Sequence, residues 1–203
     1  MFKKLFTRGK VVKEKVIQFS PPRTGSTLLW NVIRTMYPDS EVIKSHTLGA
    51  TREEHGDSAK IISSIRDPRD SIASYIQAHK LEPSEAVVRG LIDVFNEQGM
   101  SEVIDIYKNP NVLLLKYEEF AFDLDYLFDQ ISQFLGEIEN TEQMKISIGK
   151  QFSIEKMEAK SKALGDFVNY DEADHIHGRH ISKYKGQCGY YKSFLTPDLI
   201  EHN

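Results

Sequence analysis

The chain has 203 residues, 40% of them hydrophobic and 28% charged, and its formal net charge is −4. These values are typical of one globular domain, and the negative charge argues against general affinity for nucleic acid. The only cysteine is Cys188, which excludes an intrachain disulfide and favours a reducing compartment, so a cytoplasmic location is expected. No long apolar stretch follows the basic first residues, so we predict neither a signal peptide nor a transmembrane segment.

Short apolar strands alternate with helices along the chain. We expect residues 1–14 to form a flexible tail and residues 15–203 to form the domain. Strands are predicted at 16–19, 41–44, 60–65 and 112–116. Helices are predicted at 26–37, 67–79, 84–107 with a weak point at Gly99, 124–135 and 154–163. Loops are predicted at 49–59 and 165–189. The alternation predicts an α/β fold: a single three-layer domain whose central, mostly parallel sheet has helices on both faces.

The segment between the first strand and the first helix has the composition of an anion-binding loop. It reads Pro22-Arg23-Thr24-Gly25-Ser26-Thr27 and supplies backbone N–H groups, two hydroxyls after a glycine, and a cation. Because a helix N-terminus carries unpaired N–H groups and partial positive charge, it suits a phosphate or sulfate group. The loop is not a Walker A motif, since its cation precedes Gly25. The alternative is an ordinary helix cap formed by Ser26 or Thr27.

Two further polar clusters follow predicted strands. Arg66 ends the third strand and Ser74 lies two helical turns later, so a guanidinium and a hydroxyl can share a second anion. Lys44 and His46 end the second strand, where an imidazole is a natural general base and a nearby lysine favours its neutral form. The carboxyl ends of parallel strands meet at one edge of a sheet, so we expect all three clusters to form one site.

With these clusters, the sequence resembles the PAPS-dependent sulfotransferases, which transfer a sulfuryl group from 3′-phosphoadenosine 5′-phosphosulfate (PAPS) and release 3′-phosphoadenosine 5′-phosphate (PAP). The loop at 22–27 resembles the family's 5′-phosphosulfate loop, and residues 66–74 resemble its 3′-phosphate motif. The Lys-x-His at 44–46, the adenine-contacting segment at 115–120 and the carboxy-terminal closing element at 184–192 are similar to further family motifs. The motifs follow the family order between residues 16 and 196. The resemblance implies a P-loop nucleotide hydrolase-like domain.

The resemblance also implies roles for individual residues. His46 would be the general base for in-line transfer to a hydroxyl or amine, while Lys44 and Arg23 would neutralise developing charge, without a metal. The residues expected to hold PAPS and PAP are Arg23, Thr24, Gly25, Ser26, Thr27, Arg66, Ser74, Tyr117, Lys185 and Gly186. The expected partner is a small-molecule or carbohydrate acceptor.

The sequence departs from the family pattern at positions that contact the nucleotide. Arg23 stands where the cytosolic branch has lysine, as is common in the carbohydrate-modifying branch. Tyr184 replaces the first arginine of the closing element, and Leu28 replaces an adenine-stacking tryptophan. Trp30 is expected to face elsewhere, and Ile154 is expected to lie near the adenine. These changes predict weaker nucleotide binding.

Several alternatives stay open at this point. A kinase-like phosphoryl transferase would need a magnesium-binding carboxylate, for which Asp67 is the obvious candidate. A non-catalytic nucleotide-binding protein could keep the fold without the activity. The stretch from Asp174 to His180 contains His175, His177 and His180, which could bind zinc, although a solvated loop near the acceptor is favoured. A weak homodimer is a further alternative, because Lys192, Thr196 and Glu201 partly match a dimer motif of the cytosolic branch.

Overall fold

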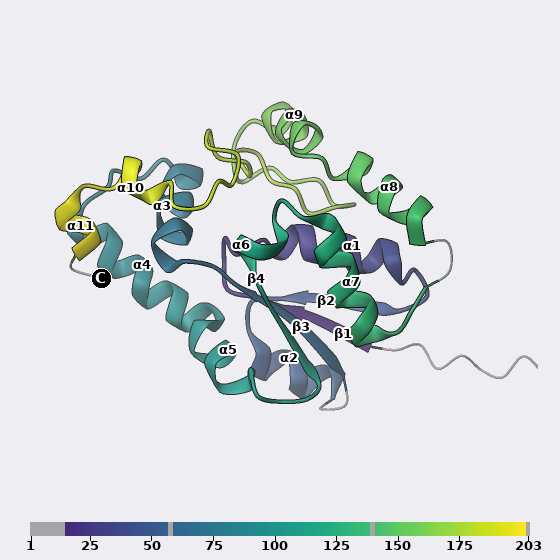
Figure 1. The fold of residues 1–203 in the computed structure, drawn as a ribbon. Helices are drawn as coiled ribbons and strands as arrows, with labels where there is room; N and C mark the ends of the chain where they lie inside the picture. The colour runs from purple at the N-terminus through teal and green to yellow at the C-terminus, as the bar shows by residue number, and fades with distance from the viewer. Residues whose placement is uncertain (1–14, 57–58, 139–140, 202–203) are drawn as a thin grey trace, which may run out of the picture.

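The computed structural model describes residues 15–56, 59–138 and 141–201, and the predicted tail at 1–14 lies outside these ranges. Four parallel strands form the sheet in the order β2-β1-β3-β4 (Figure 1). The strands are β1 (Lys15–Phe19), β2 (Glu41–Ser45), β3 (Lys60–Ile65) and β4 (Val112–Lys116). The α/β fold and the parallel sheet predicted from the sequence are therefore confirmed.

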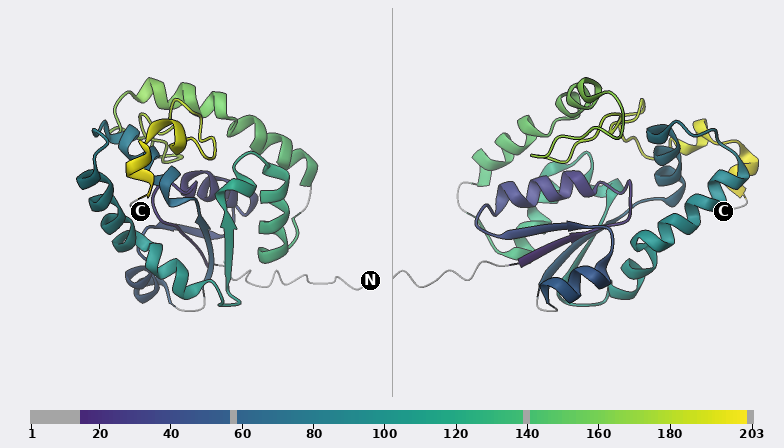
Figure 2. Two further views of the ribbon diagram at one scale, coloured as in Figure 1. Left: turned by 60° about the vertical axis from the view of Figure 1, so that its left-hand side comes forward. Right: turned by 180° about the vertical axis from the view of Figure 1, so that it is seen from behind.

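Consecutive residues of the strands point to opposite faces of the sheet, which produces two apolar layers. Val16 of β1 and Ile62 of β3 pack into the cluster formed with α1 (Ser26–Met36), α7 (Leu124–Leu135) and α8 (Thr141–Gln151). Ile17 and Ile61 pack on the opposite face with α2 (Leu48–His55) and α5 (Ser101–Ile106). Helices cover both faces of the sheet (Figure 2), as the three-layer prediction requires.

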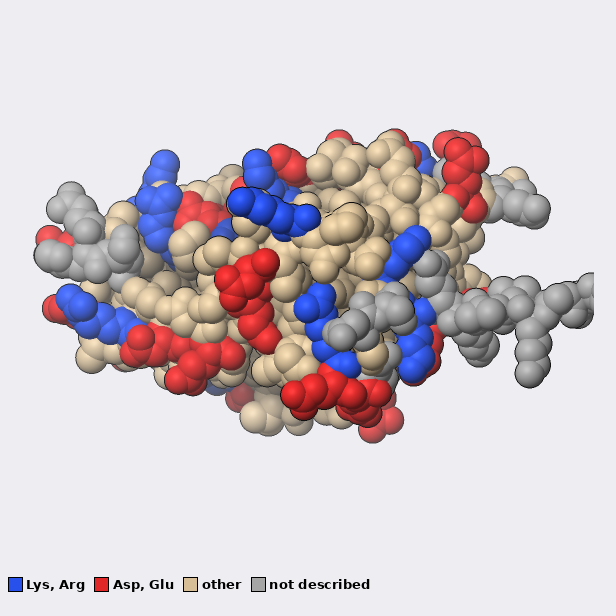
Figure 3. Space-filling view, turned by 90° about the horizontal axis from the view of Figure 1, so that it is seen from below, with Lys and Arg blue, Asp and Glu red and all other residues tan. Residues whose placement is uncertain are grey.

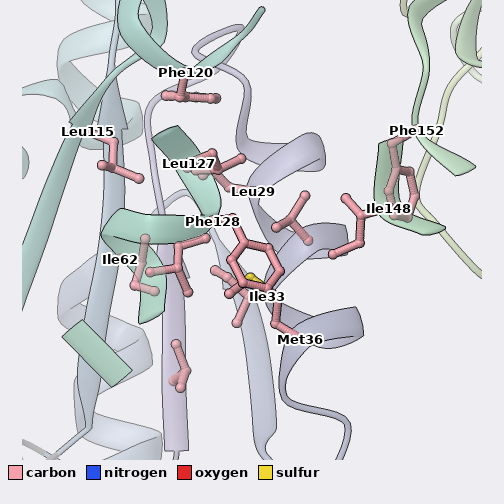
Figure 4. Packing of buried hydrophobic residues seen from close by; sticks show 13 residues of the cluster. Leu29, Ile33, Met36, Ile62, Leu115, Phe120, Leu127, Phe128, Ile148 and Phe152 are labelled. Carbon is pink, nitrogen blue, oxygen red and sulfur yellow. The ribbon is translucent and has the colours of Figure 1, made fainter. Parts of the chain in front are cut away.

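The larger apolar cluster lies between the sheet and helices α1, α7 and α8. Leu29, Ile33 and Met36 lie on one side of α1 at helical spacing and are at most 2% exposed. Phe128 of α7 packs in the same cluster, and Ile148 of α8 contributes from farther along the chain (Figure 4). Burying side chains of this size stabilises the fold by about 1.5–3 kcal/mol each. This cluster fixes α1, and therefore the loop that precedes it, against the sheet.

A third apolar cluster lies outside the sheet and joins the carboxy-terminal residues to the middle of the chain. It combines Ile72 and Ile76 of α3 (Pro68–His79), Leu91 of α4 (Glu85–Phe95), and Tyr191 and Leu195. Tyr191 is the first residue of α10 (Tyr191–Phe194), and Leu195 follows that helix. The last helix, α11 (Pro197–Glu201), comes next. The segment at 165–189 is therefore tied down at its carboxyl end beside α3, as the yellow ribbon in Figure 1 shows.

The structure corrects several predicted elements. Residues 49–59 were predicted to be a loop, but α2 forms there because the Glu102 carboxylate accepts hydrogen bonds from the backbone N–H groups of Leu48 and Gly49. The helix predicted at 84–107 forms as α4, η1 (Asn96–Met100) and α5, and it is irregular at the predicted weak point, where Gly99 has a φ of +100°. Helix α9 (Ile154–Leu164) forms as predicted. The short α6 (Tyr117–Phe120), α8, α10 and α11 were not predicted.

The surface on the opposite side from α9 carries both signs of charge. Viewed from below, Lys and Arg side chains lie interspersed with Asp and Glu side chains (Figure 3). Such mixing is typical of a solvated surface. In the described part of the chain, no helix is long and apolar enough to cross a membrane.

Candidate active site

A cavity of about 390 Å³ opens beyond the carboxyl ends of the strands. Its walls come from the β1–α1 loop, the end of β2, helices α3 and α6, and the segment at 165–189. The predicted site residues that line it are Arg23, Gly25, Ser26, Thr27, Lys44, His46, Arg66, Ser74, Tyr117, Lys185 and Gly186. The three polar clusters identified in the sequence therefore meet in one cavity.

The β1–α1 loop is shaped by its glycine. Gly25 has a φ of +89°, and an added Cβ atom would lie 2.9 Å from the rings of both Tyr117 and Phe120. This position therefore excludes a side chain. The carbonyl of Gly25 accepts the N–H of Leu29, so the loop passes directly into α1, and the first residues of the helix, from Ser26 to Leu28, line the cavity.

Thr24 is the one predicted binding residue that does not line the cavity. Its side chain is buried, its hydroxyl donates to the carbonyl of Pro21 over 2.8 Å, and it accepts from Ser64 Oγ. Any contribution of Thr24 to an anion would therefore come from its backbone N–H group. The hydroxyls of Ser26 and Thr27 are the ones placed at the cavity.

Two guanidinium groups lie close together on one side of the cavity. Arg23 donates from Nε to Ser74 Oγ over 3.0 Å and from Nη2 to the carbonyl of His180 over 2.8 Å. Arg66 contacts the carbonyl of Arg23 and lies with its Cζ 4.1 Å from the centre of the Tyr117 ring. Burial, with a smaller effect of Arg66, lowers the pKa of Arg23 to about 10, so Arg23 still carries its charge at neutral pH.

This arrangement fits an anionic ligand. Arg66 is only 6% exposed, and its Nε atom is buried without a hydrogen-bond partner in the described residues. Buried polar atoms normally have partners, and an unpaired donor beside a second guanidinium indicates a place for an acceptor such as a phosphate oxygen. Asp70 lies 4.0 Å from Arg66 and offsets one of the two positive charges.

Lys44 and His46 line the cavity together. The Lys44 ammonium donates to Thr27 Oγ1 over 2.8 Å, and burial together with Arg23 lowers the pKa of Lys44 to about 8. His46 Nδ1 lies 2.6 Å from the carbonyl oxygen of Ser20. A carbonyl can only accept, so we assign the imidazole proton to Nδ1, which leaves the lone pair on Nε2. Burial lowers the pKa of His46, and Lys44 lowers it further, so the neutral form predominates at pH 7.

The closing element is held by backbone contacts as well as side chains. The buried Asp70 carboxylate accepts from the N–H of Gly189 over 2.6 Å and from the N–H of Tyr191 over 3.1 Å. The hydroxyl of Tyr117 donates to the carbonyl of Gly186 over 3.0 Å. A Cβ atom added at Gly186 would clash with this hydroxyl. Asp70 was missed from the sequence, although an acidic residue four positions after Arg66, in the first turn of the helix that follows, is a detectable signal.

Apolar side chains form another wall, near Tyr117. Leu28 and Ile154, the two positions expected beside an adenine, line the cavity with Phe122, Phe152 and Met157, which were not predicted. Trp30 is absent from the lining, as expected. Its ring lies 4.2 Å from the His175 ring and below the Arg34 guanidinium, which explains why it does not replace the missing tryptophan.

The segment with three histidines, from Asp174 to His180, packs against the rest of the protein mainly through its rings and its backbone. The His177 ring stacks on Phe167 with centroids 4.6 Å apart, and the His180 ring lies 6.1 Å from that of His177. Both line the cavity, while His175 does not. Among the residues that the structure describes, no group of three or more His, Cys, Asp or Glu side chains could hold a metal ion.

The carboxylate required by a kinase-like reading is engaged elsewhere. Asp67 forms an ion pair of 2.7 Å with Arg69 and caps α3 by accepting the N–H of Arg69. It does not line the cavity. The geometry therefore gives no support to Asp67 as a ligand of a nucleotide-bound magnesium ion.

Comparison with known proteins shows which proteins this chain resembles. The family model described as the sulfotransferase domain matches residues 35–203. The mouse sulfotransferase SULT7A1 complexed with PAP has a TM-score of 0.66 and 18% identity, with 93% of this chain and 81% of that chain covered. Retinol dehydratase in complex with androsterone and inactive cofactor PAP has a TM-score of 0.63 and 16% identity, with 93% and 78% covered. No curated protein matches the sequence significantly.

The α/β fold with a cationic site at the strand ends is suited to a ligand that carries phosphate or sulfate groups. The chain belongs to the sulfotransferase family, as the match over residues 35–203 shows. The family, the fold class and the enzyme class predicted from the motifs are thereby confirmed. The family match begins after the β1–α1 loop, so it does not cover that loop. The proposed anion-binding role of the loop therefore depends on its geometry.

Proposed function

We propose that this protein transfers a sulfuryl group from PAPS to a hydroxyl or amine of a small-molecule acceptor, with His46 as the general base. The observation that carries the proposal is the His46 Nδ1 contact of 2.6 Å with the Ser20 carbonyl, which leaves a neutral imidazole with its Nε2 lone pair available in the cavity. A base must be unprotonated to accept the proton of the acceptor. Both structural neighbours contain PAP, which supports the choice of donor.

The residues of the cavity suit the two anionic ends of the donor. Ser26, Thr27 and the backbone N–H groups at the start of α1 would hold the 5′-phosphosulfate, and Arg66 and Ser74 would hold the 3′-phosphate. Tyr117 and the apolar side chains around Ile154 would pack on the adenine. Lys185 and Gly186, from the segment that closes the cavity, would cover the nucleotide.

In the proposed reaction, the acceptor oxygen or nitrogen attacks sulfur while the bond from sulfur to the 5′-phosphate oxygen breaks. The acceptor proton passes to His46 Nε2, and the bonding pair leaves with the phosphate of PAP. Arg23 and Lys44 provide fixed positive charge for the transferred group and the leaving phosphate, and such preorganised charge is usually the largest catalytic contribution.

The acceptor is proposed to be small because the cavity must also hold the nucleotide. A volume of about 390 Å³ lies in the usual range of ligand pockets, about 300–1,000 Å³. The lining also includes polar side chains and rings, among them Tyr75, His79 and Gln98. Within this proposal the acceptor could be a carbohydrate, because sugar hydroxyls could form hydrogen bonds with these polar side chains. A cytoplasmic location is proposed from the single cysteine.

The donor is tested by calorimetric titration with PAP, AMP, and ATP with magnesium. We expect selective binding of PAP, and a large loss of PAP affinity in Arg66→Ala. Preference for ATP with magnesium would contradict the sulfotransferase proposal and support a kinase.

The reaction is tested by following sulfuryl transfer from PAPS to a panel of phenols, alcohols and sugars. His46→Ala should lower kcat by about 100-fold or more and keep its PAP affinity, because general base catalysis contributes about 10²–10⁴-fold. His175→Asn is the matched control, since His175 lies outside the cavity, and it should keep wild-type kcat. Equal loss of turnover and of PAP binding in His46→Ala would refute the role of base. Wild-type PAP binding without turnover on the panel would support the non-catalytic alternative.

A further inference from the structure

We propose that His180 is a second catalytic imidazole, which donates a hydrogen bond from Nε2 to an oxygen of the transferring sulfuryl group. The inference rests on the proposed function and deepens it. It assigns to one cavity two imidazoles with opposite roles, a proton acceptor at His46 and a hydrogen-bond donor at His180.

His180 lines the same cavity as the two cations Arg23 and Lys44. Its backbone carbonyl accepts from Arg23 Nη2 over 2.8 Å, so the residue is joined directly to the loop arginine. Arg23 and Lys44 are the cations proposed to face the sulfuryl group, so His180 shares the cavity with the place where charge develops during transfer.

His180 is held by contacts of both its backbone and its ring. Its backbone N–H donates to the hydroxyl of Ser161 over 2.7 Å, and Ser161 is only 2% exposed. Its carbonyl is bound by Arg23, and its ring is stacked nearly parallel to that of His177, at 14°. Both ends of the residue and its ring plane are therefore fixed, which is the condition for a preorganised hydrogen-bond donor.

The neutral His180 ring carries its single proton on Nε2. Nδ1 of His180 is buried without a partner in the described residues, whereas the residue lines the cavity. An orphaned buried N–H group is rarer and less favourable than an orphaned acceptor, so the single proton of the neutral ring belongs on Nε2. Burial, reinforced by Arg23, Lys44 and His177, holds the pKa of His180 well below its usual value, so the ring is neutral.

The consequence is a donor that carries no charge of its own. Nε2–H of His180 can bind a sulfuryl oxygen, and Nδ1 can remain unprotonated throughout the transfer. His46 takes the acceptor proton, and the bond from sulfur to the 5′-phosphate oxygen breaks as before, so His180 neither gains nor loses a proton. Its contribution is to stabilise the negative charge on the sulfuryl oxygens in the transition state.

The test exploits the difference between PAPS and PAP, since only PAPS has the sulfuryl group. His180→Phe keeps a flat ring and the backbone contacts to Arg23 and Ser161, but it has no donor. We expect kcat to fall about 10- to 100-fold, somewhat less than the cost of removing an oxyanion-hole donor in other enzymes. PAP affinity measured by calorimetry should stay within about twofold of wild type, because PAP makes no use of the donor. His180→Asn, which retains an N–H donor, should recover part of the lost kcat.

The control is His175→Asn, which removes an imidazole outside the cavity and should leave kcat unchanged. An unchanged kcat in His180→Phe would overturn the inference while leaving the sulfotransferase proposal intact. The inference would also be overturned if His180→Phe lost kcat and PAP affinity in parallel and His180→Asn recovered neither. His180 would then have only a structural role. Absence of transfer in the wild type would instead contradict the proposed function.

Discussion

At the scale of single residues, the site depends on side chains whose ionisation is altered by burial. Lys44 and His46 lie at the end of β2, and both have lowered pKa values. The two shifts have opposite consequences for catalysis. His46 has to be neutral to act as a base, which the shift favours, whereas Lys44 has to stay charged, which the shift opposes.

These shifts predict a bell-shaped pH dependence of kcat/KM for sulfuryl transfer. The rate should rise as pH increases through the lowered pKa of His46, below 6.5, and should fall above about 8 as Lys44 loses its proton. In Lys44→Arg the falling limb should move to higher pH, because a guanidinium remains protonated there. A falling limb that is unchanged in Lys44→Arg would show that another group limits the rate at high pH.

Gly25 supplies a second prediction at this scale. Its φ of +89° and the rings of Tyr117 and Phe120 leave no room for a Cβ atom. Gly25→Ala should lower the free energy of unfolding by about 1–3 kcal/mol and weaken PAP binding, because the loop has to shift. Gly90→Ala, in the exposed interior of α4 with open space around its Cβ, should instead stabilise by about 0.5–1 kcal/mol. Urea unfolding of the two variants measures the contrast, and equal effects would contradict it.

At the scale of elements, the cavity depends on the attachment of the closing element to α3. Asp70 is buried in α3 and accepts the backbone N–H groups of Gly189 and Tyr191. The same carboxylate lies 4.0 Å from Arg66. One residue therefore positions both the segment that is proposed to cover the nucleotide and a guanidinium that is proposed to bind it.

Asp70→Asn should lower the free energy of unfolding by about 3–5 kcal/mol, because it leaves Arg66 buried without its counter-charge and offers one acceptor in place of two. PAP affinity should fall as well, since the closing element is no longer held. Asp67→Asn is the control: the Asp67–Arg69 pair is 26% and 39% exposed, and asparagine can still cap α3, so the cost should be at most about 1 kcal/mol. Similar unfolding curves for the two variants would show that Asp70 does not hold the element.

At the scale of the whole molecule, the cavity exists only when distant parts of the chain are assembled. Its lining extends from Pro22 to Gly186 and includes residues from both sides of the sheet. The three apolar clusters bring these parts together. A ligand in the cavity therefore contacts nearly every layer of the domain.

Binding of PAP should accordingly stabilise residues 15–203 as one unit. At a concentration about 100 times Kd, PAP should add about 2.7 kcal/mol and raise Tm by about 5–10 °C, with a single calorimetric transition. AMP, which lacks the 3′-phosphate, should raise Tm less at the same concentration. Two transitions, of which PAP moves only one, would contradict the single-domain prediction.

The sequence by itself determined the strands, the loop between β1 and α1, and the clusters Arg66–Ser74 and Lys44–His46 at the strand ends. Apolar runs, helix-start residues and motif spacing are local signals, and parallel strands bring their carboxyl ends together. Only the tertiary structure decided what depends on long-range contacts. Helix α2 forms because Glu102, more than 50 residues away, caps it, and the hydroxyl of Thr24 turns inward because Ser64 lies beneath it. Asp70 accepts the backbone N–H of Gly189, and the Arg23 guanidinium donates to the carbonyl of His180, both across more than 100 residues. No periodic pattern in the sequence encodes such pairings.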